Sequence, residues 1–150
     1  MLPQLNFPSY KLRVRKTGGK LYVFDIIRRK FVRLVPEEWV RQHMVHYLIE
    51  ELGYPRAMIR TEVGQKYHRL QKRSDVVVYD NGGHVFLLIE CKAPTVRIGQ
   101  AAVDQLSTYN QRYRSQYLAL TNGLRHYVVK MQYDTPGSVM IDDFPHYHRV

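Results

Sequence analysis

Apolar and polar residues alternate near the start of the chain. Residues 11–16 place Leu12 and Val14 between basic residues, which is the two-residue period of a β-strand. The turn residues Thr17-Gly18-Gly19-Lys20 follow, and residues 21–27 continue as a second strand. We therefore expect an N-terminal β-hairpin, with residues 31–35 as a third short strand or as the approach to a helix.

Two later segments have the longer period of helices. Residues 36–52 begin with Pro36 and two acids, which suit the first turn of a helix, and an apolar stripe then continues until Gly53 ends it. A second stripe runs through residues 99–113, at Ala102, Leu106, Tyr109 and Tyr113. These spacings of three and four residues predict two helices.

Nearly unbroken apolar runs at residues 74–79 and 84–92 predict a central hairpin whose strands are covered on both faces. Further strands are expected at residues 58–65, 116–121 and 126–131. Asn122-Gly123 is a turn signal between the last two of them. The order helix, strands, helix, strands predicts one α/β domain over residues 1–150, with a mixed sheet between helices.

The strands at 74–79 and 84–92 carry charged residues. If residues 81–84 form the loop between them, Asp80 pairs with Val85 and Asp75 lies opposite Glu90. Because side chains alternate along a strand, Glu90 and Lys92 point to one face and Cys91 to the other. Two carboxylates beside an ammonium could bind a divalent cation for phosphodiester hydrolysis, or could form an ion pair that serves structure alone.

Composition narrows the class of partner. Lys and Arg outnumber Asp and Glu by 23 to 13, which gives a formal charge of +10 and favours nucleic acid first and an anionic membrane second. The basic residues are scattered rather than gathered in one tail, so we expect folded basic surfaces. The single cysteine excludes an internal disulfide and suits a reducing cytoplasm. No run of eighteen apolar residues and no secretory signal is visible, so we expect a cytoplasmic protein with no membrane partner.

The motifs and their order resemble the PD-(D/E)xK nuclease superfamily. Within it, the closest resemblance is to the N-terminal nuclease domain of type I restriction enzyme R subunits, over roughly residues 20–130. The motifs that carry it are Pro36-Glu37-Glu38-Trp39-Val40-Arg41-Gln42, Lys72-Arg73-Ser74-Asp75, Glu90-Cys91-Lys92-Ala93-Pro94, Gln105-Leu106-Ser107-Thr108-Tyr109 and Leu120-Thr121-Asn122-Gly123. Two departures are expected from this resemblance: no helicase motor follows, and the strand motif reads Ser74-Asp75 rather than Pro-Asp, a departure that the superfamily often shows.

This resemblance implies an α/β, restriction-endonuclease-like fold, in which a mixed central sheet is flanked by helices. Residues 1–35 would be the arm and hairpin, residues 36–131 the nuclease core and residues 132–150 a C-terminal extension. It also implies Mg²⁺ or Mn²⁺ held by Asp75, Glu90 and the backbone carbonyl of Cys91, with Lys92 acting on the attacking water and the phosphate.

Further residues are implied around that centre. Gln105 and Tyr109 on the second helix would lie near the nucleic acid, although Tyr109 also belongs to the apolar stripe. Arg69, Lys72 and Arg73 would contact phosphates, or would form a solvated basic loop.

Glu37 and Glu38 compete for the acidic position on the first helix. Glu38 is favoured because it precedes Val45 and Leu52 by seven and fourteen residues and so shares their inward face. Arg41, three residues after Glu38, could pair with it.

The expected function is Mg²⁺-dependent endonucleolytic hydrolysis of DNA. The alternative is a non-catalytic module on a nuclease fold that binds nucleic acid or docks on a partner. A protein partner would supply the motor or specificity function, and a homodimer would suit double-strand cleavage. The sequence does not distinguish DNA from RNA as the substrate, sequence-specific from non-specific cleavage, or an endonuclease from an exonuclease.

Overall fold

The computed structural model describes residues 2–63, 74–110, 113–134 and 138–148. Within these ranges, the side chains at positions 62, 63, 74, 75 and 109 are not described. The elements are β1 (Val14–Thr17), β2 (Lys20–Asp25), β3 (Lys30–Arg33), α1 (Pro36–Glu50), a 3₁₀ turn (Arg56–Met58), β4 (Ile59–Val63), β5 (Ser74–Tyr79), β6 (Val85–Cys91), α2 (Gln100–Tyr109), β7 (Tyr117–Thr121), β8 (His126–Met131) and β9 (Ser138–Ile141).

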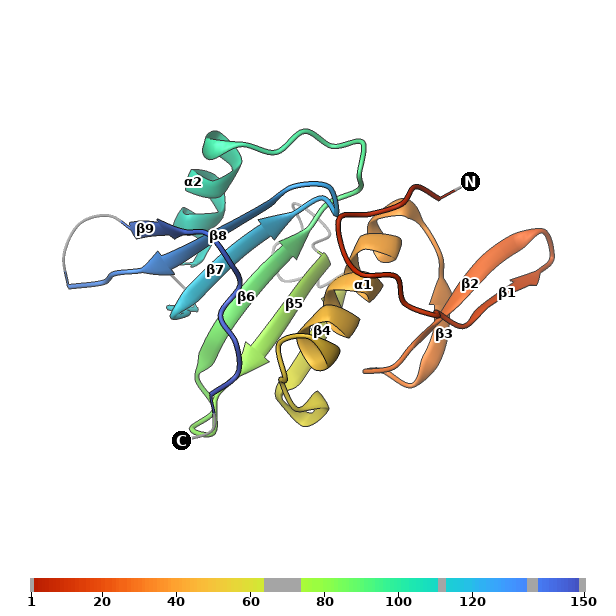
Figure 1. Cartoon of the computed structure of the whole chain (residues 1–150), viewed down its shortest axis with the longest axis horizontal. Helices are drawn as coiled ribbons and strands as arrows, with labels where there is room; N and C mark the ends of the chain where they lie inside the picture. The colour runs from red at the N-terminus through yellow and green to blue at the C-terminus, as the bar shows by residue number, and fades with distance from the viewer. Residues whose placement is uncertain (1, 64–73, 111–112, 135–137, 149–150) are drawn as a thin grey trace.

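A six-stranded mixed sheet forms the body of the molecule, with the strand order β4-β5-β6-β7-β8-β9. All neighbouring pairs are antiparallel except β6 and β7, which run parallel because α2 connects them. Figure 1 shows the twisted sheet from β4 to β9, with α1 beside β4 and β5 and with α2 beside β7 and β8. The predicted α/β fold with a mixed sheet and an N-terminal hairpin is confirmed.

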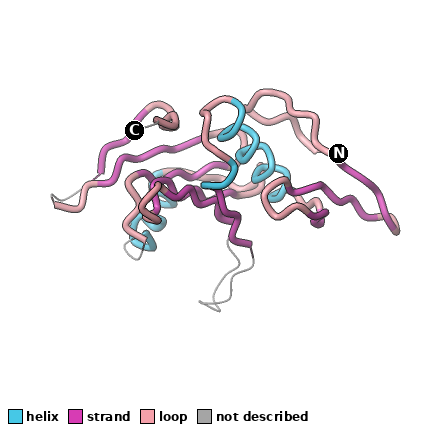
Figure 2. The backbone as a smooth tube through the Cα atoms, turned by 90° about the horizontal axis from the view of Figure 1, so that it is seen from below, coloured by secondary structure: helices cyan, strands magenta, loops and turns pink. Residues whose placement is uncertain are grey.

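The two helices cover opposite faces of the sheet, as the edge-on view of Figure 2 shows. On one face, Val76, Leu87 and Ile89 join a core with Met44 and Leu48 of α1. On the other face, alternate residues of the same strands pack with α2, namely Val77, Leu88, Leu118 and Leu120 against Val103 and Leu106. Residues of β5 and β6 are therefore buried on both sides, which explains their nearly continuous apolar sequence.

The N-terminal hairpin is part of a separate three-stranded antiparallel sheet, ordered β1-β2-β3. Gly18 and Gly19 make the two-residue turn between β1 and β2, and both have positive φ, which glycine adopts without strain. The β1–β2 hairpin projects away from the central sheet (Figure 1). Of the two alternatives for residues 31–35, the structure has the third short strand, β3, which spans Lys30–Arg33.

The N-terminal arm is held on the body at the β7–β8 turn. The Asn6 backbone N–H donates to the carbonyl of Gly123 at 2.7 Å. Gly123 has φ +87°, and a Cβ there would lie 2.7 Å from the Leu5 side chain. Only glycine fits this approach without displacing the arm.

Three details differ from the sequence prediction. Asp75 does lie opposite Glu90, but Tyr79 pairs with Val85, because a bulge shifts the register and Asp80 instead closes the loop. The second helix ends at Tyr109 instead of Tyr113. The short apolar piece near residue 140 is an edge strand, β9, that pairs with β8.

The physical reasons are local hydrogen bonds. The Asp80 carboxylate accepts from the N–H groups of Gly82 and His84, both at 2.9 Å, so this residue belongs to the turn. At the end of α2, the Asn110 carbonyl accepts from two later backbone N–H groups, and its side-chain oxygen accepts from the Ser115 hydroxyl at 2.8 Å. The side-chain bond to Ser115 and the positive φ of Arg114, +50°, turn the chain out of the helical path here. No helix in the described ranges is long and apolar enough to cross a bilayer.

Candidate active site

The site begins with a row of acidic residues in the register of the central sheet. In the antiparallel pairs β4–β5 and β5–β6, Glu62 lies opposite Asp75, and Asp75 lies opposite Glu90. Like charges directly opposite one another destabilise a sheet unless a cation offsets them. Glu62 was not singled out from the sequence, although it is an acid inside the predicted strand 58–65, as Asp75 and Glu90 are inside theirs.

Lys92 supplies one cationic group at this row. Its Nζ lies 3.1 Å from Oε2 of Glu90, and its side chain keeps 33% of its surface exposed. The backbone N–H of Lys92 donates to the Thr121 carbonyl at 2.8 Å, which fixes the residue just beyond the end of β6. Glu90 itself is 6% exposed. The pair therefore has a nearly enclosed carboxylate and an ammonium that still reaches solvent.

Cys91 lies between these two residues and turns the other way. Its side chain is 1% exposed and belongs to the core under α1. This confirms that the thiol fills space in the core, as its position in the alternation predicted. Its backbone carbonyl stays a predicted metal ligand.

The two acids at the start of α1 have different surroundings. Glu38 is 4% exposed, as the predicted inward face requires. Its carboxylate accepts hydrogen bonds from Arg41 and, at 2.7 Å, from the Gln42 amide, and Nη2 of Arg28 lies 3.7 Å away. The predicted pair of Arg41 with Glu38 is confirmed. Glu38 is therefore engaged inside the protein on several sides.

Glu37 is the helix acid whose carboxyl is influenced by the charges of the site. Burial raises the pKa of its carboxyl above the usual value, and Glu90 and Glu38 raise it further. The cationic groups of Arg41 and Lys92 oppose this shift. The structure thus places Glu37 within electrostatic reach of Glu90 and Lys92.

The other predicted residues are less fully placed. Gln105 is exposed on α2, beside the buried Leu106. Tyr109 is the last residue of α2, and its side chain lies outside the described part. Arg69, Lys72 and Arg73 lie outside the described residues altogether. Contacts of these residues with nucleic acid remain predictions.

The donor set at the site suits a hard divalent cation. Carboxylate and carbonyl oxygens are the ligands that Mg²⁺ prefers. Among the side chains that the structure describes, no three His, Cys, Asp or Glu groups converge closely enough to hold a metal ion. A metal here would therefore need Asp75, whose side chain is not described but whose backbone faces Glu90.

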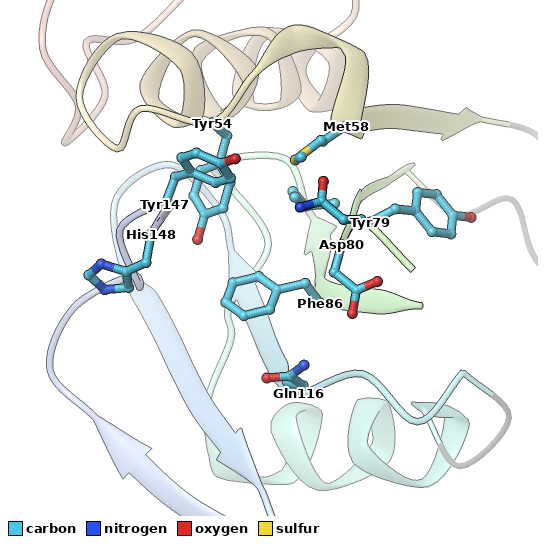
Figure 3. Close-up of a pocket in the computed structure, with 10 residues that line it drawn as sticks. Tyr54, Met58, Tyr79, Asp80, Phe86, Gln116, Tyr147 and His148 are labelled. Carbon is cyan, nitrogen blue, oxygen red and sulfur yellow. The ribbon is translucent and has the colours of Figure 1, made fainter. Parts of the chain in front are cut away.

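Two cavities lie away from this centre. One, of about 300 Å³, is at the loop end of β5 and β6, where the rings of Tyr54, Tyr147 and Phe86 face a common space (Figure 3). The other, of about 500 Å³, lies between the N-terminal arm, the end of α1, β8 and the segment after β9, and three of its lining residues are acids: Glu51, Asp142 and Asp143. Neither cavity has Lys or Arg among its described lining residues, so neither suits a phosphodiester.

Comparison with known proteins agrees with the motifs. The family model for the type I restriction enzyme R protein N terminus (HSDR_N) matches residues 36–145. No match was found among curated proteins or among solved structures. The matched segment spans α1, the whole central sheet and α2, and so contains Glu38, Asp75, Glu90 and Lys92. The chain belongs to the family of type I restriction enzyme R protein N-terminal domains.

Proposed function

We propose that this domain hydrolyses phosphodiester bonds of DNA as a Mg²⁺- or Mn²⁺-dependent endonuclease. The observation that carries the proposal is the pairing of Asp75 with Glu90 across β5 and β6, with Lys92 at 3.1 Å from Glu90. Membership of a restriction enzyme family supports a nuclease-related role. The set of two acids and one lysine supplies the types of group that metal-assisted phosphodiester hydrolysis uses.

Asp75, Glu90 and the Cys91 carbonyl would hold the metal ion. When bound, Mg²⁺ polarises the phosphate and lowers the pKa of a bound water. Glu62 is a further candidate, because its register position continues the row of acids. Lys92, as an exposed ammonium beside Glu90, would orient the attacking water and offset negative charge on the scissile phosphate.

The acids of α1 would act in different ways. Glu37, within electrostatic reach of Glu90 and Lys92, would adjust the charge of the centre. Glu38 would be a positioning residue, because Arg41, Gln42 and Arg28 already occupy its carboxylate. Gln105 and Tyr109, with Arg69, Lys72 and Arg73, would contact the nucleic acid.

A plasmid assay tests the proposal. Supercoiled DNA is incubated with the full chain in Mg²⁺, in Mn²⁺ and with a chelator, and nicked and linear products are followed. We expect cleavage by the wild type that needs the cation, and none by Glu90→Gln. Lys130→Met, which removes an exposed charge on β8, is the control and should cleave normally. Wild-type cleavage by Glu90→Gln would reject the site, whereas binding without any cleavage would favour the non-catalytic alternative.

A further inference from the structure

The positive charge of the chain is concentrated in its N-terminal sheet. Residues 11–33 contain nine of the 23 Lys and Arg residues and one of the 13 Asp and Glu residues. This segment therefore has a formal charge of +8 in a chain of +10. The family match begins at residue 36 and does not include it. Its basic residues are Lys11, Arg13, Arg15, Lys16, Lys20, Arg28, Arg29, Lys30 and Arg33.

The strand register sorts this charge by face. Arg15 pairs with Tyr22, Tyr22 pairs with Arg33, and the Phe24 N–H donates to the Arg13 carbonyl at 2.8 Å. Directly opposite residues share a face. One face, which we call the outer face, therefore carries Arg13, Arg15, Lys20, Tyr22, Phe24, Phe31 and Arg33. The other face includes Val23 and Asp25, which are 0% and 1% exposed.

Aromatic rings hold the outer-face arginines in place. The guanidinium of Arg13 lies over Phe24 at 4.5 Å and over Phe31 at 5.5 Å from the ring centres. Arg15 lies over Phe31 at 4.1 Å. Both arginines remain exposed, while the rings beneath them are partly buried. A guanidinium held this way loses less conformational freedom when it binds an anion.

The sheet is fixed to the part of the molecule that borders the candidate active site. Asp25 accepts from the backbone N–H groups of Ile27 and Arg28, and its carboxylate pairs with Nε of Arg28 at 2.8 Å. Nη2 of Arg28 lies 3.7 Å from Glu38, one residue after Glu37 on α1. The basic sheet is therefore attached at the start of the helix that also carries Glu37, whose carboxyl is influenced by Glu90 and Lys92.

We propose that the outer face binds the phosphate backbone of double-stranded DNA and supplies most of the affinity of this domain for its substrate. Guanidinium groups match phosphate geometry, and several on one face would contact successive phosphates. Two of the three rings, Phe24 and Phe31, are covered by arginines, so they are not open to stack on unpaired bases. Contacts to a duplex backbone therefore fit this face better than contacts to a single strand.

Fluorescence anisotropy with a labelled DNA duplex, in a chelator so that no cleavage occurs, tests the proposal over about 50 to 200 mM salt. The full chain is compared with Arg13→Gln/Arg15→Gln/Arg33→Gln. We expect the slope of log affinity against log salt to fall by about 0.9 for each lost phosphate contact, and affinity near 0.1 M salt to fall on the order of 10²-fold. The matched control is Arg56→Gln/Arg125→Gln/Lys130→Gln, which removes the same charge from exposed positions elsewhere. It should keep the wild-type slope.

Phe31→Leu separates ring support from charge. It keeps every arginine but removes the ring under Arg13 and Arg15, so we expect affinity to fall about two- to fivefold with little change in slope. Circular dichroism confirms that each variant is folded before its affinity is compared.

Several results would overturn the proposal. They are equal effects of the two triple variants, wild-type affinity in the outer-face triple variant, or tighter binding of a single strand than of a duplex. Glu90→Gln should bind the duplex with the wild-type slope. Failure of the proposed hydrolysis would therefore be distinguishable from failure of this binding surface.

Discussion

Glu38 and Glu90 are both nearly enclosed carboxylates, with 4% and 6% of their surface exposed, but their cationic partners differ. Glu38 is bound by Arg41, which is 2% exposed, and by the wholly buried Gln42. The partner described for Glu90 is Lys92, which is one-third exposed. Arg41 and Gln42 are closed to a substrate, and Arg28, at 26% exposed, is already paired with both Asp25 and Glu38, whereas Lys92 reaches solvent beside Glu90. Two similarly buried glutamates therefore have different surroundings: that of Glu38 attaches one part of the fold to another, and that of Glu90 is the one for which we propose chemistry.

The network around Glu38 also joins two parts of the molecule. Arg28 belongs to the N-terminal sheet and pairs with Asp25, while Arg41 and Gln42 belong to α1. Three of its polar atoms, namely Arg28 Nη2, Arg41 Nε and Gln42 Oε1, are buried and make no hydrogen bond. Such a network is sensitive to the loss of any member, because an unpaired buried charge is costly. The predictions below use this contrast.

The largest effect should come from Lys92. In Lys92→Met the ammonium that would orient water and offset phosphate charge is lost, so the single-turnover rate of DNA cleavage should fall roughly 10²- to 10⁴-fold. The melting temperature should fall less than in Arg41→Met, because solvent reaches the Lys92 side of this pair, whereas Arg41 is 2% exposed. Lys92→Arg keeps the charge and should restore part of the rate. A large loss of stability with unchanged cleavage per folded molecule would place Lys92 among the structural residues.

Arg41→Met should have the opposite profile. Removing this buried cation leaves the Glu38 carboxylate without its main partner, and the free energy of unfolding should fall by about 3–5 kcal/mol. Denaturant unfolding measures this loss. The fraction that remains folded at low temperature should still cleave DNA. Unchanged stability with abolished cleavage would instead assign Arg41 to the catalytic centre.

Asp25→Asn should weaken the attachment of the N-terminal sheet in a pH-dependent way. Burial raises the pKa of Asp25, but the hydrogen bonds and charge of Arg28 outweigh burial and hold the pKa below the ordinary value of 3.8. A carboxyl with a lowered pKa stabilises the folded state above its unfolded pKa and loses that contribution as pH falls through its folded pKa.

Wild type should therefore exceed Asp25→Asn in unfolding free energy at neutral pH, by about 1–3 kcal/mol. The gap should narrow below the unfolded pKa of 3.8, as acid protonates Asp25. Denaturant unfolding at a series of pH values measures it. A gap that is constant with pH would contradict the ion pair as its cause.

The smallest effect should come from Glu50→Gln. The Glu50 side chain is 55% exposed, and its Oε2 lies 3.2 Å from Nδ1 of His46 on the same helix. Helix-surface pairs of this kind contribute about 0.3–0.5 kcal/mol, so the free energy of unfolding, measured with denaturant, should barely change. A loss of unfolding free energy as large as that of Arg41→Met would show that exposure does not explain the difference between the His46–Glu50 pair and the Arg41–Glu38 pair.

The sequence predicted the elements that carry strong local patterns. The valine run of β5 and an assumed loop at residues 81–84 paired Asp75 with Glu90 correctly, although Tyr79 and not Asp80 pairs with Val85, because the bulge between Val78 and Tyr79 offsets this one-residue difference. The bulge at Tyr79 could not be predicted, since it depends on how the Asp80 carboxylate closes the loop. The strand β9 was missed because its short apolar piece is an exposed edge strand that is defined by its pairing with β8.

The charged surfaces could not be predicted from the sequence, because strand pairing and contacts between separate elements create them. Along the chain the basic residues seemed scattered, but the register of β1, β2 and β3 brings Arg13, Arg15 and Arg33 to one face. The link from Arg28 to Glu38 joins two separate elements, and no spacing in the sequence indicates it. The inward direction of Glu38 was correctly predicted from its heptad spacing, whereas the surroundings that engage it required the folded chain.

The most direct test of the central claim is calorimetry of Mg²⁺ and Mn²⁺ binding to the wild type and to Asp75→Ala/Glu90→Ala. The account predicts that the wild type binds the cation and that the double variant, still folded, does not. A wild type that binds neither ion, even with DNA present, or a double variant that binds as the wild type does, would contradict the assignment of these two carboxylates to a metal centre.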